Sequence, residues 1–181
     1  MLTITIPATE KYDEIRGEFI YAKEQTLQLE HSLVSISKWE SKWCKPFLDS
    51  KREKSNEEVI DYVKCMTLNK NVDESAYLCL TQANIAAIND YIGAPMTATY
   101  FSNTDKGKKN NEQTTSELIY YWMIALNIPF ECQKWHINRL LTLIRVCNIK
   151  NQPPKKMSKR EIMSRNAALN AARRQQMNTK G

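Results

Sequence analysis

The chain has 181 residues, of which 42% are hydrophobic and 25% are charged, and it contains only 4 Gly and 6 Pro. This composition suits a packed core of one domain with an appendage, and it excludes low-complexity and collagen-like chains. The longest apolar run, Leu118–Phe130, is too short to cross a bilayer, and the amino terminus lacks a basic segment followed by an apolar one. We therefore predict a soluble protein with neither a membrane span nor a signal peptide.

The net charge of +6 is unevenly distributed along the chain. Residues 150–181 contain nine Lys or Arg and one acid, whereas residues 1–149 contain 17 bases and 19 acids. Basic tails of this kind commonly bind nucleic acid or an acidic protein surface. The sequence thus predicts a body over residues 1–150, followed by a linker and a basic helical tail over residues 151–181.

Two segments near the amino terminus favour β-strands. In Leu2–Ile6, Leu and Ile alternate with Thr until Pro7, and in Thr26–Glu30, Leu alternates with Gln and Glu. The two segments are able to pair as a small antiparallel ribbon. A lone ribbon is marginally stable, so we expect it to pack on helices.

Apolar residues at three- and four-residue steps predict helices from Leu33 onward. The first ends before Pro46, and the second begins at a capping box of Ser55 and Glu58. Asp73 and Thr81 are predicted to begin two further helices. The helix that begins at Ser55 has one apolar face, formed by Val59, Ile60, Val63 and Met66. In the helix that begins at Thr81, the residues expected to face inward are Ile85, Ile88 and Ile92.

The second half of the body contains the most apolar segments. After a polar loop at residues 96–113, Thr115 or Ser116 is expected to cap a helix over Glu117–Leu126. A long helix is predicted over Glu131–Ile149. Because both helices have apolar residues outside a single stripe, we expect them at the centre of a helical bundle.

The tail begins with a break at Asn151–Lys156, where two prolines remove amide donors. A second capping box, Ser158 and Glu161, predicts a last helix to about Met177. This helix is rich in Ala and Arg, and its apolar stripe is thin. Its large apolar residues are Ile162, Met163, Leu169 and Met177.

No pattern in the sequence indicates an active site, so we predict no catalytic, cofactor-binding or metal-binding residues. Four widely spaced glycines exclude phosphate-binding loops, and the five cysteines form no CxxC pair, so they are expected to be reduced core thiols. Cys132 and His136 have the spacing of two metal ligands on one helix, but the other half of such a site is missing. We interpret both as packing residues.

Four tryptophans, Trp39, Trp43, Trp122 and Trp135, are expected to pack in the core. The alternative for the first two is a stacking platform for nucleic-acid bases, because Lys38, Lys42 and Lys45 flank them.

The basic tail is open to three interpretations. Its Lys and Arg side chains suit phosphate binding, docking on an acidic protein surface, or a solvated arm that keeps the protein soluble. The small residues in Asn166–Ala172 allow close helix approach and favour a protein partner. From the residues alone, the chain is a mainly helical, non-enzymatic binding protein.

Five segments also resemble one family, the tail assembly chaperones of bacteriophages with long non-contractile tails, of the lambda type. The resemblance spans nearly the whole chain and is carried by these segments: Leu29–Trp43, Ala94–Thr99, Glu117–Met123, Ile128–Leu141 and Asn166–Arg174. The resemblance implies a chaperone in the host bacterial cytoplasm that is absent from the mature virion. It also implies binding to the tape measure protein, recruitment of tail tube protein, and a longer form made by programmed ribosomal frameshifting. Lys155–Lys156 is one candidate place for the slippery codons.

The sequence therefore predicts a mainly α-helical bundle with a small N-terminal β-ribbon and a basic C-terminal helical arm. We expect the arm to contact its partner through Ile162, Leu169, Arg173 and Arg174. The alternatives are a structural protein retained in the virion, such as a tail completion or connector subunit, and a nucleic-acid-binding module, which is less favoured.

Overall fold

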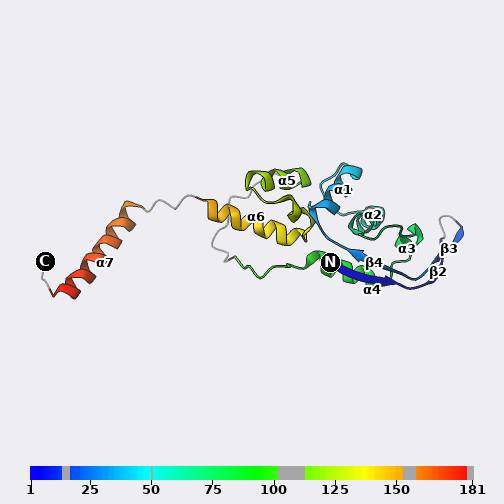
Figure 1. The fold of residues 1–181 in the computed structure, drawn as a ribbon, viewed down its shortest axis with the longest axis horizontal. Helices are drawn as coiled ribbons and strands as arrows, with labels where there is room; N and C mark the ends of the chain where they lie inside the picture. Colours follow the sequence, from blue (N-terminus) through cyan, green and yellow to red (C-terminus); the bar gives the residue numbers. More distant parts are fainter. Residues whose placement is uncertain (14–16, 50, 102–112, 153–157, 179–181) are drawn as a thin grey trace. The chain divides into compact units, whose positions relative to one another are not determined.

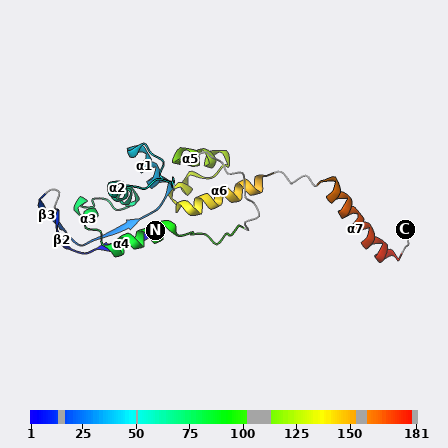
Figure 2. The ribbon, with the colours of Figure 1, turned by 180° about the vertical axis from the view of Figure 1, so that it is seen from behind.

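A computed structural model describes residues 1–13, 17–49, 51–101, 113–152 and 158–178 (Figures 1 and 2). The described part of the chain is mostly helical, with a small antiparallel β element near the amino terminus. Its strands are β1 (Leu2–Ile6), β2 (Thr9–Asp13), β3 (Glu18–Ala22) and β4 (Gln25–Leu29). Its helices are α1 (Leu33–Trp43), α2 (Asn56–Met66), α3 (Glu74–Leu78), α4 (Gln82–Gly93), α5 (Ser116–Ala125), a 3₁₀ helix η1 (Phe130–Lys134), α6 (Ile137–Asn151) and α7 (Lys159–Met177).

Strands β1 and β4 form the predicted antiparallel ribbon, with Ile4 opposite Leu27 and Leu2 opposite Leu29. One face, which includes Ile4, Ile6, Leu27 and Leu29, is buried, and the Thr and Gln residues between them face outward. A two-stranded ribbon is only marginally stable by itself, so this one depends on helix α4, which packs against β1. Residues after α2 also bind the free edge of β4, since the Leu68 N–H donates to the Gln28 carbonyl at 2.8 Å.

Strands β2 and β3 form a second antiparallel pair that was not predicted from the sequence (Figure 1). Tyr12 lies opposite Phe19, and their rings are 5.0 Å apart between centroids. Tyr12, Phe19 and Tyr21 are all more than half exposed. Strands were predicted from the alternation of apolar and polar residues, which marks a strand with one buried face. The β2–β3 pair lacks this pattern because cross-strand contacts between exposed aromatic rings stabilise it.

Helix α1 lies at the centre of the core. Leu33, Ile36 and Trp39 are completely buried at three-residue steps, as the periodicity predicted. Trp39 also donates its indole N–H to the Glu58 carbonyl of α2 at 2.9 Å, so its one polar atom is satisfied inside the core. Core packing is thereby confirmed for Trp39, while Trp43, Trp122 and Trp135 are only partly buried against the core.

The predicted helix starts are confirmed at each position where a capping side chain was identified. Ser55 and Ser158 form the two expected capping boxes, and Asp73, Thr81 and Thr115 cap α3, α4 and α5. These caps depend on hydrogen bonds between residues two or three apart, so the local sequence is sufficient to specify them.

The single long helix predicted over Glu131–Ile149 is wrong. The chain forms η1, is extended at Trp135, and then begins α6 at Ile137. At the break, His136 pairs with Ser32 in an antiparallel bridge, and the Ile137 N–H donates to the His31 carbonyl at 2.8 Å. These hydrogen bonds join segments more than a hundred residues apart and replace the hydrogen bonds of a continuous helix. The periodicity of apolar residues along the sequence does not reveal them.

A buried carboxylate joins α1 to two distant segments. Glu40 is 7% exposed, and its two oxygens accept the backbone N–H groups of Phe47 at 2.8 Å and Ser116 at 2.7 Å. Ser116 begins α5, so this one side chain holds the amino end of α5 against α1.

Replacement of this carboxylate is expected to destabilise the fold. Glu40→Ala leaves two buried N–H groups without acceptors and should lower the free energy of unfolding by about 2 to 4 kcal/mol. Urea unfolding followed by tryptophan fluorescence measures the change. Glu57→Ala, at an exposed acid in the first turn of α2, is the matched control and should change stability by less than about 1 kcal/mol. Equal effects of the two substitutions would contradict the assignment.

The chain divides into two compact units, Met1–Asn148 and Ile149–Gly181. Most of the predicted loop at residues 96–113 and most of the predicted break at Asn151–Lys156 lie outside the described residues, as does the candidate frameshift position at Lys155–Lys156.

Candidate functional site

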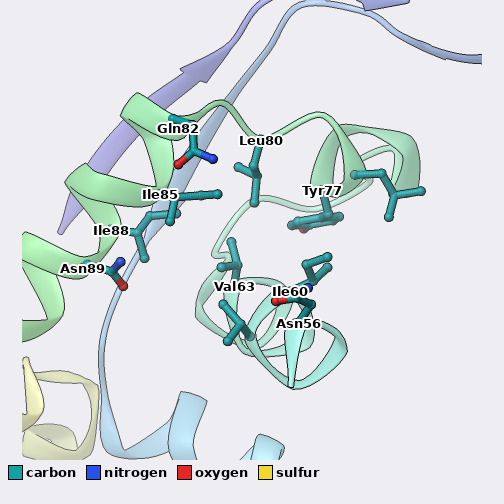
Figure 3. Close-up of a pocket in the computed structure, with 11 residues that line it drawn as sticks. Asn56, Ile60, Val63, Tyr77, Leu80, Gln82, Ile85, Ile88 and Asn89 are labelled. Carbon is teal, nitrogen blue, oxygen red and sulfur yellow. The ribbon is translucent and has the colours of Figure 1, made fainter. Parts of the chain in front are cut away.

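A groove lies between α2, α3 and α4 in the first unit (Figure 3). It encloses about 420 Å³, and apolar side chains form most of its wall. Val63 and Ile88 are buried at its base, whereas Val59 and Ile85 are 42% and 36% exposed. Three uncharged polar residues complete the lining: Asn56, Gln82 and Asn89.

Burial of the apolar groove residues was predicted correctly for Val63 and Ile88 and incorrectly for Val59 and Ile85. Val59 and Ile85 were predicted to face the core, yet both face the open groove. Tyr62 and Tyr91, which were not predicted to be buried, occupy core positions on α2 and α4 beside Val63, Met66 and Ile88. Tyrosine is able to occupy them because each hydroxyl has a buried or half-buried partner, His31 at 2.5 Å and Glu30 at 2.7 Å.

Helix α5 has an apolar outer face as well as an apolar inner one. Ile119 and Met123 are completely buried, while Tyr121 and Ile124 are 63% and 61% exposed. The expectation that α5 lies at the centre of a bundle is therefore wrong, because only one side of it is covered. Glu117 is the only charged residue within α5, so its outer face is an unusually apolar surface for a body helix.

The four residues predicted to bind a partner all lie on α7. Ile162 and Leu169 are separated by two helical turns and so share a face, and Arg173 follows Leu169 by one turn. Arg174 lies next to Arg173, and its carbonyl accepts the N–H of the C-cap residue Asn178. No residue of α7 is buried, and Ile162 and Leu169 are 43% and 46% exposed. Helix α7 thus presents aliphatic and basic side chains together.

The lysines beside Trp43 are engaged in ion pairs with acids of α2. Lys42 pairs with Asp61, which also accepts the Trp43 indole N–H at 2.9 Å, and Lys45 pairs with Glu58 at 3.0 Å. The Ser55 backbone N–H and the Lys45 ammonium hold the pKa of the Glu58 carboxyl at about 2. This network fixes α1 to α2 and disfavours the base-stacking platform, because two of its three predicted lysines, Lys42 and Lys45, already have carboxylate partners.

Two histidines meet in the interior of the first unit. The His31 and His136 rings are 5.0 Å apart, edge to face. His136 donates its Nε2–H to the Tyr91 carbonyl at 3.0 Å, and its Nδ1 accepts the Asn138 N–H at 3.3 Å, so the neutral ring satisfies both nitrogens. Burial, with a smaller contribution from His136, lowers the pKa of His31 to about 3, and burial also lowers the pKa of His136.

Cys132 and His136 do not lie on one helix, as the sequence analysis assumed, since Cys132 belongs to η1 and His136 precedes α6. Within the described ranges, no group of three or more His, Cys, Asp or Glu side chains is placed to hold a metal ion.

Comparison with protein-family models, curated proteins and solved structures finds no match to this chain. Over the part of the chain that the structure describes, no helix combines the length and hydropathy needed to span a bilayer.

Proposed function

We propose that this chain is a phage tail assembly chaperone that binds the tape measure protein, keeps it soluble and helps recruit tail tube protein. It acts by binding and not by catalysis, in the host cytoplasm, and it leaves before the virion is complete. The proposal rests on the resemblance of five segments to that family, and one structural observation carries it. Helix α7 exposes four large apolar residues on a strongly basic helix: Ile162, Met163, Leu169 and Met177.

The physical task of such a chaperone matches a helix of this kind. A long helical protein that has not yet been enclosed by its tube exposes an apolar face and tends to aggregate. A chaperone that covers this face stabilises the soluble form by mass action and needs no active site. In this proposal, Ile162 and Leu169 of the basic arm contact the apolar face, while Arg173 and Arg174 pair with acids beside it.

The outer face of α5 provides a second contact surface on the helical bundle. Tyr121 and Ile124 form an apolar surface there, and Phe130 of the following 3₁₀ helix is also more than half exposed. We assign this surface to the same partner, because two separate apolar surfaces on one chaperone cover a longer stretch of a helical client.

Co-expression with the tape measure protein of the same phage tests the proposal. We expect a soluble complex that is recovered at both 50 and 500 mM NaCl, because salt weakens ion pairs between exposed groups but not apolar contacts. The tape measure protein expressed alone, which should be insoluble, is the control. Failure to form a complex, together with recovery of the chain in purified virions, would favour the structural-subunit alternative. Binding to DNA that falls about a thousandfold or more between 50 and 200 mM salt would favour the nucleic-acid alternative.

A further inference from the structure

Helix α6 carries two exposed arginines whose guanidinium groups lie over aromatic rings. The guanidinium carbon of Arg139 is 4.1 Å from the centre of the Trp135 ring, and that of Arg145 is 4.0 Å from the centre of the Phe101 ring. A guanidinium held over a ring has less freedom to lose on binding, and the N–H donors at its edge stay available. Each ring therefore prepares its arginine to bind a planar acceptor.

Both arginines belong to the outward side of α6. The buried residues of this helix, Ile137, Leu140 and Ile144, form a stripe on the opposite side. Arg139 and Arg145 flank the solvent-facing stripe, and their six-residue separation corresponds to a rise of about 9 Å along the helix axis. One elongated partner that lies along this side of α6 is able to contact both guanidinium groups.

The segment around these arginines contains no neutralising acid. Residues 132–148 contain three bases, Lys134, Arg139 and Arg145, and no Asp or Glu. Within the described ranges, the ion pairs all involve other cations, such as Lys42 and Lys45 of the network between α1 and α2. The outward side of α6 is thus a positively charged surface whose guanidinium groups have no carboxylate partner among the described residues.

We propose that Arg139 and Arg145 bind the carboxylates of an acidic segment of a protein partner. Arginine and carboxylate form paired, charge-assisted hydrogen bonds, which are stronger than those between neutral groups. Nucleic acid is the less suitable polyanion, because guanidinium groups already lie over the two rings that bases would stack on. Two arginines are also few beside the about six to ten phosphate contacts of a protein whose binding is strongly salt-dependent. The proposal goes beyond the function proposed above, since it needs neither α7 nor a particular client.

Binding of a fluorescently labelled peptide of about twelve glutamates to the full chain, followed by anisotropy at about 50 mM NaCl, tests the proposal. Arg139→Gln combined with Arg145→Gln should weaken binding by about tenfold. Lys51→Gln combined with Lys70→Gln removes the same charge from exposed positions of the first unit and is the matched control. It should weaken binding by less than about threefold. Equal effects of the two pairs would show general electrostatic attraction and overturn the proposal.

Two further comparisons test the chemistry of the contact. Arg139→Lys combined with Arg145→Lys keeps both charges but removes the planar forks, so we expect binding to weaken by about threefold or more. An unchanged affinity would refute paired hydrogen bonds to carboxylates. With single-stranded DNA of about twelve thymidines as the probe, the two Arg→Gln substitutions should lower the affinity by less than about threefold. The same loss for DNA as for the glutamate peptide would overturn the assignment to an acidic protein segment.

Nuclear magnetic resonance of the unaltered chain gives a test that does not depend on how a variant folds. The Nε–Hε signals of Arg139 and Arg145, assigned with the single substitutions, should shift when the glutamate peptide is added. Shifts confined to other arginines would show that the peptide binds elsewhere and refute the proposal. The result is independent of the tape measure pull-down, so this site and client binding are able to fail separately.

Discussion

Removal of residues 154–181 is expected to abolish co-purification with the tape measure protein while leaving the rest of the chain folded. The deleted segment contains all of α7, including the four predicted contact residues, and residues 1–148 form a compact unit with its own buried core. Pull-down of the co-expressed client measures binding. Circular dichroism and a cooperative thermal transition establish that the truncated chain is folded. Retained binding would show that the client is held elsewhere, and the outer face of α5 would then be the first surface to alter.

Point substitutions in the full chain separate the apolar and ionic parts of this contact. Ile162→Ser combined with Leu169→Ser removes two aliphatic side chains and should weaken binding by about a hundredfold or more if both are buried by the client. Arg173→Gln combined with Arg174→Gln should weaken it by about tenfold or less and reduce its salt dependence. Gln175→Ser combined with Gln176→Ser, farther along the same helix, is the control and should have little effect. A larger loss from the arginine pair than from the aliphatic pair would contradict an apolar interface.

Acidification from pH 6.5 to pH 4.5 is expected to lower the free energy of unfolding by about 2 kcal/mol through His31 alone. Burial, with a smaller contribution from His136, lowers the pKa of His31 from 6.5 to about 3 in the folded chain. Between these two values the unfolded chain binds a proton that the folded chain does not, so stability falls by about 1.4 kcal/mol per pH unit as pH falls. The chain is most stable above about pH 7.5, and stability is lost progressively from there towards pH 3. His136, whose pKa is also lowered by burial, contributes with the same sign.

Urea unfolding at pH 7.0, 5.5 and 4.5 measures this dependence, with tryptophan fluorescence as the probe. His31→Gln removes the titrating ring and should flatten the pH dependence, although it lowers stability at pH 7 because the ring also contacts Tyr62. Glu58 is expected to contribute little between pH 6.5 and pH 4.5. Its pKa is lowered from 4.5 to about 2 in the folded chain, so the stability that it provides is lost between about pH 4.5 and pH 2. A free energy of unfolding that stays constant between pH 6.5 and 4.5 in the unaltered chain would contradict the assignment.

The candidate contact surfaces were only partly predictable. The basic helix was predicted to its boundaries, because a capping box and a run of good helix formers are local signals. The groove was not, although its residues were identified as apolar. Periodicity shows that Val59 and Ile85 lie on the apolar sides of their helices. When the apolar stripe of a helix is wide, however, periodicity does not show which of its residues stay exposed to solvent. The outer face of α5 was misjudged for the same reason.

The sequence by itself determined the helix starts, the strand segments β1 and β4, and the separation of a near-neutral body from a basic tail. Each depends on residues within a few positions of one another, or on composition alone. Only the tertiary structure decided the break before Ile137, the burial of Tyr62 and Tyr91, the exposure of Val59 and Ile85, and the meeting of His31 with His136. These features depend on hydrogen bonds and packing between segments dozens of residues apart. Such partners compete with local preference, and the interaction that buries more apolar area and satisfies more polar groups prevails.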